Sequence, residues 1–132
     1  MANRVRYTVD SIINNRFYQM PKFLFEGELI ALNNDSRVLY SLLKDRHELS
    51  LTNGWINEKG EVYLIYTRKD MEYMLGLSDK TVKKAIDQLK EYGLVEEEKQ
   101  GLNRPNLIYL TTISVENQGI GNSPTPESEI RF

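Results

Sequence analysis

Residues 67–110 constrain the fold more than any other part of the chain, because they combine two helix-start signals with glycine stops. Thr67 is placed to cap a short helix that ends at Gly76, and Ser78 is placed to cap a second helix. A Ser or Thr hydroxyl at such a position accepts an amide hydrogen that the first helical turn leaves without a partner. The pattern therefore predicts two helices joined by a tight turn. The short helix is expected to bury Met71, Met74 and Leu75.

The second helix has one apolar stripe and is followed by two segments typical of strands. The stripe has helical spacing and comprises Val82, Ile86 and Leu89, with Ala85 and Tyr92 at its edge. Gly93 is a natural stop for this helix. Residues 94–100 and 107–113 are predicted strands, and the polar stretch 101–106 is the loop between them. A helix-turn-helix followed by a β-hairpin is a winged helix, and the second helix of such a pair usually enters the major groove of DNA.

The outward face of this second helix supports contact with DNA. Its basic residues lie in the N-terminal half, where the helix dipole is positive and free amides can meet phosphate, whereas Asp87 and Glu91 lie further along. The side chains expected nearest the DNA are Lys80, Thr81, Lys83 and Lys84. Gln88 lies to one side and reaches an adenine if the helix is tilted. The alternative is a solvated helix face, since lysine is common on any exposed surface.

The loop of the predicted wing offers one cation and two amides. Arg104 stands beside Asn103 and Asn106 on this short loop. We expect Arg104 to reach toward a flanking phosphate or the minor groove, because a narrow, A·T-rich minor groove attracts arginine. These three residues form the predicted DNA-binding set of the wing.

The composition limits the classes of function. The 132 residues have a net charge of −2, so any affinity for DNA must come from a local basic patch. The absence of cysteine removes disulfides and thiolate metal sites, and no apolar run is long enough to span a membrane. His47 is the only histidine and has no partner ligands in the pattern. The sequence therefore predicts a cytoplasmic protein with no metal, no cofactor and no membrane contact.

The N-terminal segment is rich in aromatic and aliphatic residues. Alternation at residues 5–9 predicts a short strand, Asp10 can cap a short helix, and residues 22–31 predict another short helix after Pro21. So many apolar side chains must be buried against another surface. Packing on their own domain and a homodimer contact through residues 4–25 are both open at this point.

One further helix and one further strand are expected to complete the core. The cap residues at 33–36 predict a helix that runs to about residue 49. Its buried face is predicted to carry Val38, Leu39, Leu42 and Leu43, with Arg37, Lys44, Asp45 and Arg46 opposite. Residues 62–66 predict a strand that pairs with the hairpin. The predicted fold class is α+β, a winged helix-turn-helix with an N-terminal extension and a small antiparallel sheet, over residues 1–113.

The last part of the chain has a different composition. Residues 114–132 are rich in Gly, Ser, Pro, Asn and Glu. Such a segment cannot bury enough apolar surface to fold alone. We expect it to be a flexible linker or tail that leads to a C-terminal domain outside this chain.

Several stretches together resemble a known family. They are YQMPKFLF at 18–25, LYSLLKDR at 39–46, LSLTNGW at 49–55, QGLNRPN at 100–106 and IYL at 108–110. These stretches resemble the N-terminal domain of RepA-type replication initiators from low-copy plasmids of Gram-positive bacteria, including staphylococcal multiresistance plasmids. The resemblance covers about residues 4–113. It implies a winged-helix domain that dimerises and binds repeated double-stranded DNA sequences at the plasmid origin to initiate replication.

The same resemblance implies two further relationships. One is to the N-terminal domain of the DnaD primosomal protein. The other is a separate C-terminal domain that engages host replication proteins.

Other functional classes are weighed against this interpretation. The sequence has no paired carboxylates in a catalytic setting, no phosphate-binding glycine loop and no nucleophile motif, so no catalytic residue and no enzyme is predicted. Two alternatives are a winged-helix transcriptional regulator and a protein-interaction domain that uses this fold without DNA. An initiator differs from a regulator by its target, since it should bind tandem repeats in a replication origin.

Overall fold

The computed structural model describes residues 3–114, and the linker predicted at 114–132 lies outside this range except for its first residue. Five α-helices, two 3-10 helices and two strands are found among the described residues. The α-helices are α1 (Val9–Asn14), α2 (Asn34–Asp45), α3 (His47–Asn53), α4 (Arg68–Leu75) and α5 (Asp79–Glu91). The 3-10 helices span Lys22–Phe25 and Gly27–Ala31, and the strands are β1 (Val95–Glu98) and β2 (Leu107–Leu110).

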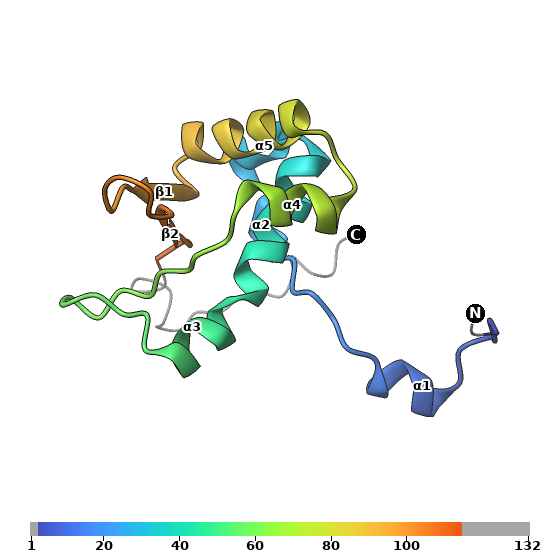
Figure 1. Cartoon of the computed structure of the whole chain (residues 1–132). Coiled ribbons are helices and arrows are strands. Elements are labelled where there is room, and N and C mark those ends of the chain that lie inside the picture. Colours follow the sequence, from blue (N-terminus) through green and yellow to red (C-terminus); the bar gives the residue numbers. More distant parts are fainter. Residues whose placement is uncertain (1–2, 115–132) are drawn as a thin grey trace.

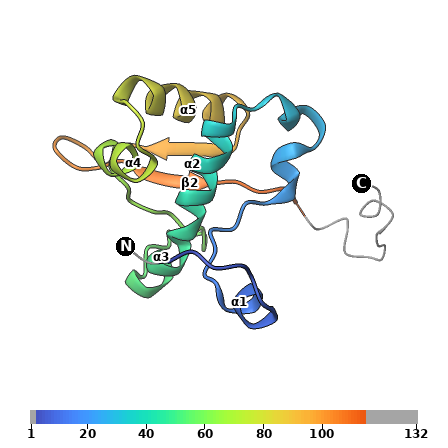
Figure 2. The same ribbon diagram turned by 90° about the vertical axis from the view of Figure 1, so that its right-hand side faces the viewer.

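The core lies where α2, α4 and the β1–β2 hairpin meet α5. Both α2 and α4 pack against α5, and the hairpin follows directly from its C-terminal end (Figure 1). The fully covered side chains include Leu39, Leu43, Met71, Val82, Ile86, Leu89 and Ile108. This arrangement leaves the opposite face of α5 to solvent. The hairpin lies along α5, and its loop extends past α4 (Figure 2).

The helix-turn-helix begins at the predicted caps. The Thr67 hydroxyl accepts the Asp70 amide at 3.1 Å, and the Ser78 hydroxyl accepts the Thr81 amide at 3.2 Å. Gly76 ends α4 with φ of 65°, a left-handed conformation that a residue without Cβ adopts at little cost. The apolar stripe of α5 is buried as predicted. Met74 is a correction, because its side chain is 47% exposed and only Met71 of the predicted trio is fully covered.

The sheet is smaller than the sequence predicts. The two strands are four residues each and pair antiparallel, with Val95 opposite Leu110 and Glu98 opposite Leu107. The predicted strand at 62–66 pairs with the hairpin only through one bridge, in which Leu64 and Ile108 exchange amide–carbonyl hydrogen bonds of 2.8 and 2.9 Å. Val62 in the same segment forms a second isolated bridge, with Ile56 rather than with the hairpin, and the chain then turns into α4.

The predicted helix from 33 to 49 is two helices in the structure. Helix α2 ends at Arg46, whose backbone amide donates to the carbonyls of Leu43 and Lys44. Helix α3 then continues to Asn53. Arg37 is a second correction: it is 7% exposed rather than on a solvated face, because residues 24–30 cover it. Val38, predicted to be buried, is 43% exposed.

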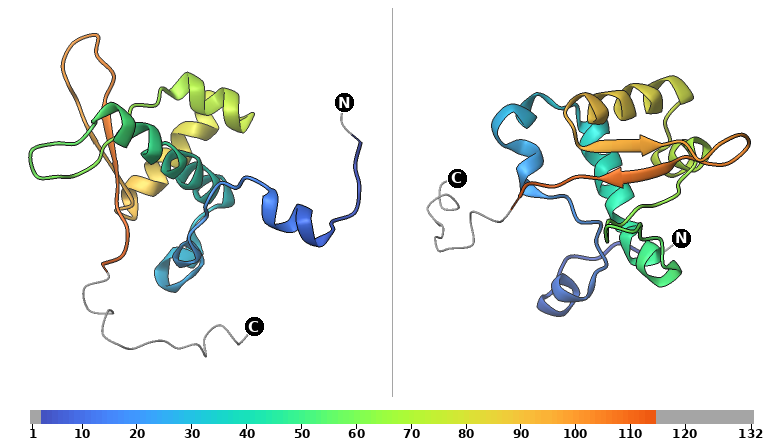
Figure 3. Two further views of the ribbon diagram at one scale, coloured as in Figure 1. Left: turned by 90° about the horizontal axis from the view of Figure 1, so that it is seen from below. Right: turned by 90° about the vertical axis from the view of Figure 1, so that its left-hand side faces the viewer.

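The N-terminal segment extends away from the rest of the domain (Figure 3). Residues 5–8 form no strand, and Thr8 rather than Asp10 caps α1 through a reciprocal pair of bonds with Ser11. The predicted helix at 22–31 is present as the two 3-10 turns, of which the first buries Leu24. None of the helices in the described range is long and apolar enough to cross a membrane.

Candidate nucleic-acid interface

The exposed face of α5 carries the predicted lysines. Lys80, Lys83 and Lys84 are all exposed, and they project from the first half of the helix, which starts at the Ser78 cap. Among the described residues, Lys80 and Lys84 form no ion pair. Their charges are therefore not offset by a neighbouring carboxylate, and Lys80 in the first turn lies at the positive end of the helix dipole.

Lys83 is in a different electrostatic environment. Its Nζ lies 2.8 Å from Asp87 Oδ2, one helical turn away, and both side chains are exposed. The hydrogen bond from Lys83 lowers the pKa of Asp87, with smaller contributions from the charges of Lys90 and Arg68. Asp87 is therefore ionised at neutral pH, so it offsets part of the positive charge of Lys83.

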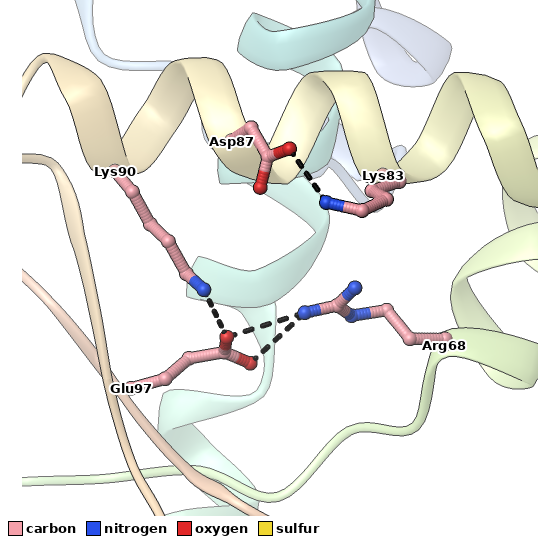
Figure 4. Close-up of polar contacts among 5 residues, drawn as sticks. All are labelled: Arg68, Lys83, Asp87, Lys90 and Glu97. Atoms are coloured by element: carbon pink, nitrogen blue, oxygen red, sulfur yellow. Dashed lines mark hydrogen bonds and ion pairs between the residues drawn. The ribbon is translucent and has the colours of Figure 1, made fainter.

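A buried carboxylate joins the two helices to the hairpin. Glu97 of β1 lies between Lys90 of α5, at 2.5 Å, and Arg68 at the start of α4, at 3.2 Å (Figure 4). Its side chain is 10% exposed. Burial alone would raise the pKa of this carboxyl, but hydrogen bonds and charge from Lys90 and Arg68 bring it below the usual range. The contact fixes the hairpin against the helix-turn-helix.

We expect the Glu97 carboxylate to make the free energy of unfolding depend on pH in the acidic range. Because the pKa of Glu97 is below 4.5 in the fold, its ionised form stabilises the domain above that pH, and the contribution is lost as the pH falls below 4.5. Glu97→Gln should lower the free energy of unfolding at pH 7 by about 1 kcal/mol, since both cationic partners are partly solvated. It should also flatten the fall in stability below pH 4.5. Urea unfolding at a series of pH values measures both effects.

Glu96→Gln is the matched control, because Glu96 is exposed on the same strand. Equal pH profiles for the two variants would contradict the assignment.

The structure places Gln88 on the flank of α5 that faces α2. The Gln88 side-chain oxygen accepts the Asn33 amide at 2.9 Å and the Ser36 hydroxyl at 2.6 Å. A bidentate contact with adenine needs this oxygen as well as the amide nitrogen, so we leave Gln88 out of the proposed interface. Thr81 is half-buried, and its hydroxyl contacts that of Ser78 at 3.0 Å.

The wing loop presents Arg104 at its exposed end. Asn103 has φ of 62° and the Arg104 amide bonds the Gly101 carbonyl at 3.3 Å, which makes a tight turn at the tip. The Gln100 side chain donates to the Pro105 carbonyl at 2.8 Å and closes the base of the loop. Asn103 and Arg104 are exposed, whereas Asn106 is half-buried and less accessible. The wing loop projects past the end of the hairpin (Figures 2 and 3).

Comparison with known proteins identifies the family. The family described as "Replication initiator protein A (RepA) N-terminus" matches residues 16–122. The chain belongs to this family. The resemblance drawn from the sequence is thereby confirmed.

Relatives of this RepA N-terminal domain support the fold assignment. It is 37% identical over 112 residues to a 41 kDa protein of Lactobacillus helveticus, a match that covers 80% of this chain and 32% of that protein. The chain thus spans about a third of that relative's length. A solved structure described as the N-terminal domain of a DNA binding protein is 34% identical with a TM-score of 0.71, and the match covers 86% of this chain and 88% of that one. A Rep–DNA complex is 34% identical with a TM-score of 0.69, with 82% and 84% covered. The predicted winged helix is confirmed.

Sequence reasoning missed two basic residues and one apolar residue next to the RepA domain's candidate interface. Arg68 starts α4 and lies beside Lys83 and Asp87 (Figure 4). Lys99 follows β1 at the base of the wing, and Leu102 near its tip is 87% exposed. Arg68 could have been identified from the sequence, because it directly follows the Thr67 cap. A side chain in the first turn of a helix lies close to backbone amides that have no partner within the helix and can bind an anion.

Proposed function

We propose that this domain binds double-stranded DNA sequence-specifically at repeats in a plasmid origin, as a step in the initiation of plasmid replication. The observation that carries the proposal is the exposed pair Lys80 and Lys84 at the N-terminal half of α5, next to a projecting wing. This geometry lets α5 enter a major groove while the wing loop reaches the adjacent backbone.

The basic residues on and beside α5 are expected to make different kinds of contact with DNA. At the start of α5, an ammonium group can contact phosphate or a guanine edge. Lys83 contributes less, because Asp87 offsets its charge. Arg68, which Glu97 anchors beside Lys83 and Asp87, is proposed to contact the phosphate backbone.

The target sequence distinguishes an initiator from a transcriptional regulator. Selection of bound duplexes from a random pool identifies the sequence read. An initiator predicts a motif that occurs as tandem copies in a plasmid origin, whereas single operator-like sites upstream of genes would favour the regulator. Failure to select any duplex would favour an interaction domain without DNA binding. Family membership supports the initiator over the regulator.

Arg104→Ala should weaken DNA binding in a way that reports what the wing contacts. If Arg104 lies at a phosphate, the slope of log affinity against log salt concentration should fall by about 1 and all sequences should weaken alike. If it lies in the minor groove, the loss should be largest for targets with A·T tracts beside the major-groove site. Fluorescence anisotropy over a salt series with two flanking sequences separates these results.

Lys59→Ala removes the same charge from an exposed loop that precedes the helix-turn-helix. If Arg104→Ala behaves like this control in affinity, salt slope and A·T preference, the wing does not touch DNA.

The domain is also proposed to form a homodimer through its N-terminal segment. Val5, Val9 and Ile13 are 83%, 80% and 70% exposed, and α1 has no buried residue. Apolar surface of this kind is typical of an interaction site. Deleting residues 1–15 should convert the protein from dimer to monomer, as measured by light scattering. A truncated protein that is folded and still dimeric would place the interface elsewhere.

Further properties of the whole protein follow as proposals from the family. Residues 114–132 are proposed to link this domain to a C-terminal domain that engages host replication proteins. The domain itself is proposed to be non-enzymatic and to act in the cytoplasm, where plasmid DNA is replicated.

A further inference from the structure

The N-terminal segment, here called the arm and defined as residues 3–18, carries apolar side chains that no other part of residues 3–114 covers. Tyr7, Ile12 and Phe17 are 70%, 56% and 69% exposed, in addition to the aliphatic residues described above. The arm leads away from the hairpin in two perpendicular views (Figures 1 and 3). Burying apolar side chains is favourable by about 25 cal/mol per Å², so the arm gains from any apolar surface that accepts it.

The face of the hairpin that carries Tyr109 is aromatic, and is called here the outer face. The Tyr63 ring lies 5.9 Å from that of Tyr109 and stacks at 6.3 Å on Trp55. All three rings are partly exposed. Beside Tyr109 lies a cavity of about 380 Å³ whose lining also includes Val62 and Leu110. The outer face therefore offers both apolar area and a recess for a side chain.

Charge indicates what this face accepts. Glu96 is the cross-strand neighbour of Tyr109, and with Glu98 and Glu61 it lines the same cavity. All three glutamates are exposed, and among the described residues none forms an ion pair. His47 at the cavity adds no compensating charge at neutral pH, because burial and the nearby Lys44 lower its pKa. An aromatic surface with a negative rim repels DNA and favours a basic, aromatic-containing peptide.

The two ends of the chain differ in how well they match this face. Residues 115–132 contain three glutamates and one arginine, so they have the wrong sign. The arm contains Arg4, Arg6 and Arg16 with a single aspartate, and it interleaves them with aromatic and aliphatic residues. The arm is thus complementary to the outer face in both charge and hydrophobicity.

We infer that the arm of one copy docks on the outer face of a second copy. This inference rests on the proposed homodimer and names the surface that receives the arm. The outer face is opposite to the side of β1 from which Glu97 reaches α4 and α5, since neighbouring strand residues point to opposite faces. A dimer built this way leaves α5 of each copy open to DNA.

Two charge-reversal variants test the inference. The arm variant is Arg4→Glu with Arg6→Glu, and the face variant is Glu96→Lys with Glu98→Lys. Each changes exposed residues, and thermal unfolding followed by circular dichroism verifies that the fold is kept. Light scattering should find each variant alone monomeric, with at least a tenfold weaker dimer than the parent protein. An equimolar mixture should recover a dimer, because the reversed arm then meets the reversed face, and the unchanged arm meets the unchanged face.

The control is Glu26→Lys with Glu28→Lys, which reverses two exposed charges outside the outer face. It should leave dimerisation unchanged. If the arm and face variants stay dimeric alone, or if their mixture fails to recover the dimer, the inference is wrong. Docking of the arm on its own domain predicts monomers in every sample and would also overturn it.

The failures of the two proposals are distinguishable. A dimer that survives deletion of residues 1–15 contradicts the proposed arm-mediated dimer itself. A dimer that is lost on that deletion but is indifferent to both charge reversals contradicts only the assigned receiving face.

Discussion

Replacing Arg37 with methionine should lower the free energy of unfolding by about 3 kcal/mol. The Arg37 guanidinium donates to the carbonyls of Leu24, Leu29 and Ile30 at 2.9, 3.2 and 3.1 Å. It also donates to the Asn34 side chain and lies 4.2 Å from the centre of the Phe25 ring. Methionine fills similar volume but donates nothing, and each buried acceptor left unsatisfied costs about 1–3 kcal/mol. The estimate is toward the lower end because Ile30 is largely exposed.

Urea unfolding followed by circular dichroism measures this loss, with two comparison variants. Lys22→Met removes an exposed cation from the same 3-10 segment and should change stability by less than about 0.5 kcal/mol. Arg37→Lys should lower the free energy of unfolding by an amount between those of the two methionine variants. A lysine ammonium group keeps the charge but cannot reproduce the five fixed donors of the guanidinium. If Arg37→Met is as stable as Lys22→Met, the guanidinium does not hold residues 24–30 to α2.

The helix-turn-helix could be predicted from sequence because its signals are local. Thr67 and Ser78 each bond an amide three residues ahead, so the caps depend on nothing outside their own turn. The apolar stripe of α5 likewise follows from helical periodicity, which a wheel reproduces directly. These features placed Lys80 and Lys84 on an exposed face correctly.

Arg37 and Gln88 show where local reasoning fails. A helical wheel assigns Arg37 to the face opposite the leucines, but a segment seven to thirteen residues upstream folds over that face. Gln88 is committed to Asn33 and Ser36, which are more than 50 residues away in the chain. Neither contact can be read from the periodicity of the sequence, because tertiary packing determines it and the position on the helical wheel does not.

Glu97 is an intermediate case. A run of three glutamates at 96–98 is typical of a solvated surface. In a strand, however, alternate residues face opposite sides, so the middle glutamate lies on the same side as the buried Val95. Strand periodicity could therefore have indicated an inward carboxylate, which the sequence analysis did not predict, whereas its partners Arg68 and Lys90 required the tertiary structure.

The double substitution Lys80→Ala with Lys84→Ala should lower affinity for the selected duplex by about 2–4 kcal/mol, or roughly 30- to 700-fold. Both ammonium groups are exposed on the first half of α5, and no ion pair within residues 3–114 offsets them. Their loss removes the contacts that we propose to phosphate or base edges along the first half of the helix. Alanine keeps helix propensity, so the fold should be unaffected. Fluorescence anisotropy at fixed salt measures the loss.

The control for net charge is Lys22→Ala with Lys59→Ala, two exposed lysines outside the helix-turn-helix and wing. A loss confined to the α5 variant assigns the effect to contact, whereas equal losses would mean that only overall charge matters and would remove α5 from the interface.

Single substitutions refine the assignment. Lys84→Ala should cost about 1–3 kcal/mol if it reads a base, and Lys83→Ala should cost less, because Asp87 already offsets that charge. Asp87→Asn should then strengthen binding, since it frees Lys83 and removes a negative charge from the face of α5 that is proposed to meet DNA.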